Sequence, residues 1–153
     1  MAFQIIHGDI TTVQADAIVN AANNRLAPGG GVCGAIFSAA GYQQLDRACR
    51  AIGHCPTGQA VITEGFRLPA RYVIHTVGPV WQGGKNQEPK LLEDCYRNSL
   101  MLAVQHGCKS IAFPLISAGI FGYPREEALQ IASDTIQAFL REHDMEVMLV
   151  LFG

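Results

Sequence analysis

Three short segments of the chain combine glycines with small polar side chains, a composition that suits the binding of phosphate groups. They are Gly8-Asp9-Ile10, the stretch from Asn20 to Gly34, and the stretch from Ser117 to Tyr123. Glycine has no Cβ, so its backbone can approach an anion closely, and a helix that begins at such a loop adds unpaired N–H groups with partial positive charge. Two loops of this kind can hold one diphosphate from opposite sides. The sequence therefore predicts a diphosphate-containing ligand between the second and third segments.

The glycine cluster of the second segment admits two other interpretations. Gly29, Gly31 and Gly34 match the G-x-G-x-x-G pattern of dinucleotide-binding folds. The preceding apolar run ends several residues earlier, and no acidic residue follows at the spacing that the pattern requires, so a nicotinamide dinucleotide site is disfavoured. A glycine triplet can also form a tight loop without any ligand. The second glycine-containing loop, after Ser117, favours the phosphate interpretation.

Four polar side chains near the ends of expected strands have both a binding and a structural interpretation. Asp9 could accept a hydrogen bond from an adenine amino group or cap a turn. Asn20 and Asn23 could hold ribose hydroxyls or a water molecule, or could simply form turns. His75 lies inside the apolar run YVIHTV, so we expect a hydrogen-bonded core histidine rather than a catalytic base. Composition alone leaves Asp9 open and favours the turn interpretation for Asn20 and Asn23.

The bulk composition excludes several classes of protein. The 153 residues, 49% of them apolar, fit one domain with a single buried core. Eleven basic and thirteen acidic residues give a net charge of -2 without a basic stripe, so nucleic acid is an unexpected partner. The five cysteines show no C-x-x-C spacing, so we expect reduced core thiols, with no metal and no cofactor.

The same composition bears on where the protein is found. No apolar run approaches the roughly 20 residues of a membrane-spanning helix, and the N-terminus lacks a signal-peptide pattern. We therefore expect a cytoplasmic protein without membrane association. The oligomeric state stays open, with a monomer favoured.

Short β-rich runs alternate with helical patterns along the chain. Strands are expected over residues 3–8, 16–22, 60–65, 72–77, 110–116 and 146–152, with amphipathic helices over about 89–106 and after Pro124. Several strands are apolar at consecutive positions, which is typical of a sheet covered on both faces. The pattern predicts an α/β fold, a three-layer α/β/α sandwich over residues 1–153. Such folds usually continue into a covering helix after the last strand, so whether a C-terminal helix has been removed stays open.

Five motifs together resemble a macrodomain, a module that binds ADP-ribose. They are GDITT from Gly8, IVNAAN from Ile18, GGGVCGAI from Gly29, VIHTVGP from Val73 and SAGIFGYP from Ser117. The stretches PTGQAVIT and LPARYVIHTVGPVW are most similar to the MacroD-type branch of ADP-ribosyl hydrolases and O-acetyl-ADP-ribose deacetylases. The resemblance implies a mixed, mostly parallel central sheet, and ADP-ribose and mono-ADP-ribosylated proteins as partners.

The resemblance also assigns parts of the ligand to particular residues. It places adenine at Asp9 and Ile10 with the ring of Phe152 against it, and the distal ribose near Asn23 beneath Phe121. It assigns the catalytic role to Asn23 and Cys33. The ligand-binding residues expected in full are Asp9, Ile10, Asn20, Gly30, Gly31, Val32, Cys33, Ser117, Ala118, Gly119, Ile120, Phe121, Gly122 and Phe152.

One departure from the family pattern concerns catalysis. Active MacroD-type members typically have GGVDGAIHRAAG, whereas this chain has Cys33 at the aspartate position and Phe37 at the histidine position. The aspartate is thought to orient or activate the attacking water, which suits a carboxylate better than a thiol with a pKa of about 8.5. We expect Cys33 to be a neutral thiol when a diphosphate is bound. Some viral macrodomains resemble this chain in carrying cysteine here, and in them a phosphate oxygen could help to activate the water.

Three functional hypotheses follow. The first is a hydrolase that cleaves the ester bond of ADP-ribosylated Asp or Glu side chains or of O-acetyl-ADP-ribose. The second is a reader that binds ADP-ribose without turnover, motivated by the changes at Cys33 and Phe37. The third is a binder of another adenine nucleotide. A covalent Cys33 nucleophile is disfavoured, because no motif places a histidine beside it.

Overall fold

The computed structural model describes residues 2–152 as a mixed six-stranded sheet with four α-helices. Four neighbouring strand pairs are parallel and only β3 and β4 are antiparallel, in the order β1-β6-β5-β2-β4-β3. The predicted three-layer α/β/α sandwich with a mostly parallel, mixed sheet is confirmed. The elements in chain order are β1 (Phe3–His7), a 3-10 turn (Ile10–Thr12), β2 (Ala17–Ala21), α1 (Gly31–Ala40), α2 (Tyr42–Ile52), β3 (Ala60–Glu64), β4 (Tyr72–Thr76), α3 (Glu88–Gln105), β5 (Ser110–Phe113), α4 (Arg125–Leu140) and β6 (Glu146–Leu151).

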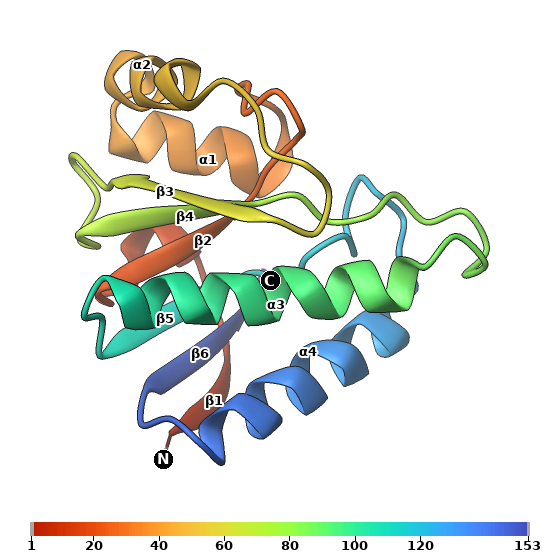
Figure 1. Ribbon diagram of the computed structural model, residues 1–153. Helices are drawn as coiled ribbons and strands as arrows, with labels where there is room; N and C mark the ends of the chain where they lie inside the picture. Colours follow the sequence, from red (N-terminus) through yellow and green to blue (C-terminus); the bar gives the residue numbers. More distant parts are fainter. Residues whose placement is uncertain (1, 153) are drawn as a thin grey trace.

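The sheet separates two helical layers (Figure 1). Helices α3 and α4 cover one face, and α1 and α2 cover the other. Successive residues of β2 show why the strands are apolar at consecutive positions: Val19 packs in the α3/α4 layer, and Ile18 packs in the α1/α2 layer. Both side chains are buried, as expected for a strand covered on both faces.

One helix agrees with the sequence expectation and another does not. Helix α4 begins at Arg125, directly after its N-cap Pro124, where a helix was expected. Helix α2 was not predicted. It buries Leu45 and Cys49, and these two residues together with Ala48 and Ile52 follow the i, i+3, i+4, i+7 spacing of an amphipathic helix, a signal that the sequence analysis overlooked.

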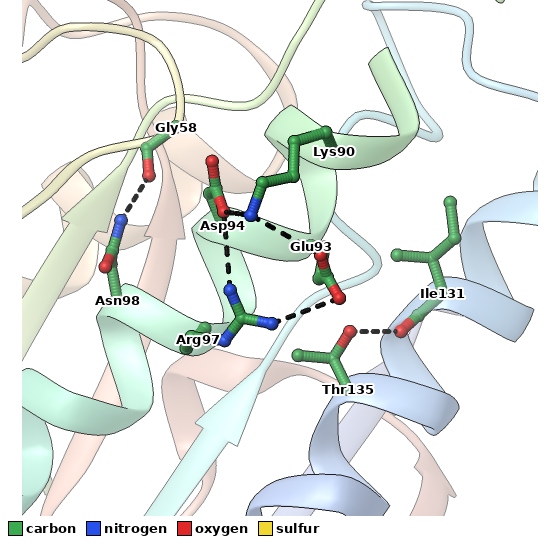
Figure 2. Close-up of polar contacts among 8 residues, drawn as sticks. All are labelled: Gly58, Lys90, Glu93, Asp94, Arg97, Asn98, Ile131 and Thr135. Atoms are coloured by element: carbon green, nitrogen blue, oxygen red, sulfur yellow. Dashed lines mark hydrogen bonds and ion pairs between the residues drawn. The ribbon is translucent and has the colours of Figure 1, made fainter. Parts of the chain in front are cut away.

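The outer face of α3 carries an ion-pair network, drawn in Figure 2. Its members are Lys90, Glu93, Asp94 and Arg97, with N···O distances from 2.9 to 3.7 Å. These side chains are partly exposed, and such pairs contribute only about 0–1 kcal/mol each. The amide of Asn98 donates to the Gly58 carbonyl at 2.8 Å and ties α3 to the loop before β3, while in α4 the Thr135 hydroxyl bonds within its own helix. Among residues 2–152, no helix is long and apolar enough to span a bilayer.

The parallel strands bring the predicted binding segments to one edge of the sheet. Strands β1, β2, β5 and β6 run in the same direction, so the loops after their carboxyl ends emerge side by side. Open α/β sheets bind ligands at this edge. The Gly8 segment follows β1, and Phe152 follows β6. The loop that contains Gly29 and Gly30, called the first glycine loop, follows β2, and the loop from Ser117 to Tyr123, called the second glycine loop, follows β5.

Candidate ligand-binding cleft

A cleft of about 610 Å³ opens at this edge of the sheet between the loops that follow β1, β2, β5 and β6. Every residue that the sequence predicted as a ligand contact lines this cleft, except Asn20 and Gly122. Apolar residues that the sequence did not single out complete its walls, among them Pro114, Leu115 and Val150. The cleft therefore combines an apolar lining with two glycine loops.

The first glycine loop presents the open N-terminus of α1 to the cleft. The first hydrogen bond of the helix ladder runs from the Gly34 N–H to the Gly30 carbonyl, at 3.3 Å, so the N–H groups of Gly31, Val32 and Cys33 precede the ladder. Gly30 is the N-cap and offers no side chain to satisfy them. The first turn contains no acidic residue, so the positive end of the helix dipole is uncompensated. This geometry suits a bound anion.

A close backbone approach also explains the glycine at position 34. A Cβ built on Gly34 would lie 2.6 Å from the Gly29 carbonyl oxygen, a distance that no side chain tolerates. Gly31 adopts a φ of 58°, which favours glycine. The glycines thus shape the loop around the start of α1.

The second glycine loop, from Ser117 to Tyr123, faces the first. Two internal hydrogen bonds close it: the Tyr123 N–H donates to the Ser117 carbonyl at 2.8 Å, and the Gly122 N–H donates to the Gly119 carbonyl at 3.0 Å. Ile120 reaches toward the first loop, because a Cβ built on Gly30 would lie 3.5 Å from the Ile120 Cδ1 atom. Gly122 is not among the residues that line the cleft, and its φ of 75° serves the turn, so its role as a ligand contact stays a prediction.

Arg125 is a lining residue that the sequence analysis missed. It is the first residue of α4, directly after the second glycine loop, and the only cationic side chain among the residues that line the cleft. The signal available in the sequence was a basic residue directly after Pro124, next to a predicted phosphate-binding loop. Glu126 and Glu127 occupy the same first turn, so the dipole of α4 is compensated and α1 is the better anion site.

Asp9 and Phe152 line another part of the cleft. The Asp9 Oδ1 atom accepts hydrogen bonds from the Thr11 hydroxyl at 2.7 Å and the Thr11 N–H at 2.9 Å, and these lower the pKa of the carboxyl. Asp9 is therefore an ionised turn cap that still lines the cleft, with Oδ2 outside both contacts. Phe152 is 86% exposed, so it is a rim residue and not a core strand residue.

Cys33 lies at the base of the α1 turn and is only 6% exposed. Burial raises the pKa of its thiol, although hydrogen bonds from Asn20 and from the Gly29 backbone oppose the shift. The thiol is therefore neutral at pH 7 in the free protein, and a neutral thiol can act as a weak hydrogen-bond donor. Its Sγ atom lies 3.8 Å from the Ala27 carbonyl oxygen.

Asn20 lies behind the cleft and not in it, which corrects its predicted role as a ligand contact. The side chain is 1% exposed, and its Nδ2 atom lies 3.7 Å from the Cys33 Sγ and 3.1 Å from the His75 Nδ1. The reason is strand alternation: Asn20 pairs with His75 across β2 and β4, and both side chains point into the α1/α2 layer. Asn20 therefore contacts Cys33 from the buried side and does not face the ligand.

His75 is the buried histidine that the sequence predicted, with no exposure to solvent. Burial lowers its pKa to about 4, so the imidazole is neutral at pH 7. Because the Asn20 amide donates to Nδ1, the ring proton sits on Nε2, which faces the Thr63 hydroxyl at 3.0 Å. The ring is thus a structural link between β2, β3 and β4.

Asn23 lines the cleft, but its amide is already engaged in the free protein. Its Nδ2 atom donates to the Ala27 carbonyl at 2.8 Å, and its Oδ1 atom accepts from the Ala27 N–H at 3.0 Å. This pair of bonds closes the loop between β2 and α1, so Asn23 positions the first glycine loop. All five cysteines are buried and free, and no cluster of three metal-ligating side chains occurs within residues 2–152.

Known proteins share both the fold and the sequence of this cleft. The sequence profile of the Macro domain matches residues 19–132, which include the end of β2, both glycine loops and the start of α4. The chain belongs to this family. A macro domain-containing protein of Chlorobaculum tepidum is 58% identical over 137 residues, 90% of this chain and 79% of the relative. A protein of Citrobacter rodentium named O-acetyl-ADP-ribose deacetylase is 58% identical over 140 residues, 89% of this chain and 78% of the relative.

Solved macrodomains superpose on this one over almost its whole length. The Oceanobacillus iheyensis macrodomain with ADP has a TM-score of 0.94 at 46% identity and covers 99% of this chain and 83% of its own. The Trypanosoma brucei macrodomain in complex with ADP-ribose has a TM-score of 0.90 at 42% identity and covers 99% of this chain and 63% of its own. The architecture of this macro domain is thus one on which related proteins bind adenosine diphosphates.

Proposed function

We propose that this macro domain binds ADP-ribose in the cleft and hydrolyses the ester bond that links it to Asp or Glu side chains or to the acetyl group of O-acetyl-ADP-ribose. The observation that carries the proposal is the uncapped N-terminus of α1 at Gly30, opposite the second glycine loop. Relatives named O-acetyl-ADP-ribose deacetylase, and solved relatives that hold ADP or ADP-ribose, support the choice of ligand.

The ligand fits the cleft in one direction. The diphosphate lies between the N–H groups that begin α1 and the second glycine loop, because these are the open donors of the cleft. Adenine lies at the end lined by Asp9 and Phe152, where a carboxylate can accept from the amino group and an exposed ring can stack. The distal ribose then points toward Asn23 and Phe121.

Catalysis on this chain depends on positioning rather than on a side-chain base. The Cys33 thiol is neutral, and Phe37 is 1% exposed and presents no polar group to the cleft. A water molecule held near Cys33 and Asn23 attacks the carbonyl carbon of the ester while a diphosphate oxygen takes one of its protons. The bond from that carbon to the ribose oxygen then breaks, the ribose hydroxyl takes back the proton, and the released acid ionises to the carboxylate. Fixed dipoles and the entropy of positioning supply much of the rate in such sites.

A reader without turnover is the second candidate, and the same two residues favour it. Neither the thiol of Cys33 nor the buried ring of Phe37 can act as a general base at pH 7. Ligand binding would then be retained, because the α1 N-terminus does not depend on them.

Release of free ADP-ribose separates the two candidates. The protein is incubated with a protein mono-ADP-ribosylated on glutamate and, separately, with O-acetyl-ADP-ribose, while ADP-ribose affinity is measured by calorimetry. We expect catalytic release from at least one substrate together with binding. Binding without release would establish a reader, and tighter binding of NAD than of ADP-ribose would point to another nucleotide.

The Cys33→Asp variant should hydrolyse the ester at least tenfold faster than the natural chain. A carboxylate can accept a proton from water, and general-base catalysis contributes about 10²–10⁴-fold. The Asn20 amide, now 3.7 Å from the Cys33 Sγ, can donate to it and keep it oriented. ADP-ribose affinity should change by less than about tenfold, or ~1.4 kcal/mol. Unchanged turnover would show that position 33 does not limit the reaction.

Arg125→Gln should weaken ADP-ribose binding by about three- to tenfold at low salt. The guanidinium is exposed, so its attraction to the diphosphate is worth about 1 kcal/mol and is screened by salt. Calorimetry at two ionic strengths measures both effects. An affinity difference that stays the same at 0.5 M salt would show a direct, desolvated contact instead of a long-range attraction.

A further inference from the structure

A buried carboxylate lies outside the cleft, beneath the irregular loop that joins β4 to α3. Glu88, the first residue of α3, is 1% exposed, and its oxygens accept from the N–H groups of Gln82 at 2.7 Å, Gly84 at 3.1 Å and Asn86 at 2.7 Å. Burial by itself raises the pKa of this carboxyl, but the three N–H donors outweigh burial and hold the pKa below its usual range. Glu88 is therefore an anion at neutral pH around which the loop is wrapped.

This loop, residues 78–87, is called the Trp81 loop after the residue that contacts the second glycine loop. It has no regular secondary structure, and Gly83, Gly84 and Gln87 all have positive φ angles, 97°, 88° and 62°. The shared acceptor that draws its N–H groups together is the Glu88 carboxylate. A Cβ built on Gly84 would lie 2.9 Å from the Trp81 Cη2 atom, so the loop presses directly on the indole ring.

Trp81 connects this loop to the second glycine loop. Its backbone N–H donates to the Phe121 carbonyl at 2.9 Å, and its ring centroid lies 4.7 Å from that of Tyr123. At the other end of the Trp81 loop, a Cβ built on Gly78 would collide with the Ser117 Oγ atom and lie 3.4 Å from the Ser117 Cβ. The Trp81 loop therefore packs against the second glycine loop at two places, outside the cleft.

We propose that Glu88 is a positioning residue for ligand binding: it fixes the Trp81 loop, and Trp81 holds Phe121 in the place where it meets the distal ribose. The two hydrogen bonds internal to the second glycine loop involve Ser117, Gly119, Gly122 and Tyr123. The Phe121 carbonyl is instead held from outside, by Trp81. The proposal rests on ADP-ribose being the ligand.

The role predicts a selective effect. Phe121 is assigned to the distal ribose, which ADP lacks, whereas the α1 N-terminus and Asp9 serve the part that ADP and ADP-ribose share. A loosened Trp81 loop should thus reduce the affinity for ADP-ribose and leave the affinity for ADP almost unchanged. A general loss of stability would not distinguish the two ligands.

Glu88→Gln tests this, with Glu93→Gln as the matched control. The control makes the same chemical change on the same helix, at a partly exposed carboxylate paired with Arg97 at 3.1 Å. We expect Glu88→Gln to weaken ADP-ribose binding about tenfold and to change ADP binding by less than twofold in calorimetry, while Glu93→Gln changes neither. Equal losses for both ligands, or no loss for either, would overturn the role of Glu88.

A second variant keeps the test open if Glu88→Gln does not fold. Gly84→Ala leaves the carboxylate in place and pushes a methyl group against the Trp81 ring, so the same selective loss is expected. Unchanged ADP-ribose affinity in this variant would contradict the proposal. Binding by the unmodified protein distinguishes the two proposals. If it does not bind ADP-ribose, the proposed function is wrong; if it does, the variants test only the role of Glu88.

Discussion

Replacement of Gly119 by valine is expected to reduce ADP-ribose affinity at least 100-fold without unfolding the protein. Gly119 lines the cleft in the second glycine loop, and a Cβ built on it meets nothing within 4 Å. The valine side chain therefore enters open space in the free protein, where the diphosphate is proposed to lie. Displacing the anion from its N–H donors costs several kcal/mol, and about 2.7 kcal/mol already corresponds to 100-fold.

Calorimetry with ADP-ribose and thermal unfolding together check this prediction. The Gly119→Ala variant serves as a graded control, because a single methyl group should cost far less affinity than the branched side chain. The melting temperature should stay within a few degrees of the natural value for both variants. A folded Gly119→Val protein with undiminished affinity would remove the second glycine loop from the binding site.

The second large effect concerns pH. The His75 side chain has an ordinary pKa of about 6.5 in the unfolded chain and a pKa of about 4 in the folded protein, where it is fully buried. Between these values the unfolded state binds the proton and the folded state does not, so the free energy of unfolding falls as the pH is lowered from 7 to 4. The loss attributable to this residue is about 3 kcal/mol.

No charged partner offsets that loss. The groups that face the His75 ring are the Asn20 amide, the Thr63 hydroxyl and the Cys49 thiol, whose pKa is raised by burial to about 12 and which therefore stays neutral. The carboxyls of Asp9 and Glu88, whose pKa values are also lowered, act in the same sense as His75, because the unfolded chain again binds the proton first. Their stabilising contribution is present above the ordinary carboxyl pKa of about 4 and is lost only at more acidic pH, below the range of the His75 effect.

Urea unfolding at pH 7 and at pH 5 measures the effect of His75. We expect His75→Gln to be less stable than the natural protein at pH 7 but to show a flatter dependence of unfolding free energy between these two values. The exposed His54, changed to Gln, is the control and should leave the slope unaltered. A slope that survives the loss of His75 would assign the pH dependence to other groups.

The strands and the two glycine loops were accessible from the sequence because each depends on neighbouring residues. A run such as SIAFPLI favours a strand locally, and its first four residues, Ser110–Phe113, form β5, which ends before Pro114. Glycines that give a loop its backbone conformation also do so locally, and the loop from Gly29 indeed ends at the start of α1. Helix α2 was missed although Leu45, Ala48, Cys49 and Ile52 have the i, i+3, i+4, i+7 spacing of a helix, a local signal that was present in the sequence.

The roles of individual side chains depended on contacts between distant parts of the chain. Asn20 and Asn23 are equivalent as residue types, yet strand alternation sends Asn20 to His75, 55 positions away, and leaves Asn23 in the cleft wall. Arg125 and Glu88 belong to no motif. The packing of α4 places Arg125 at the cleft, and the packing of α3 buries Glu88 among backbone N–H donors. The sequence by itself determined the fold class, the strands and the two loops, since backbone preferences are local. The tertiary structure decided which polar side chains meet the ligand, because burial and hydrogen bonding depend on partners that folding brings together.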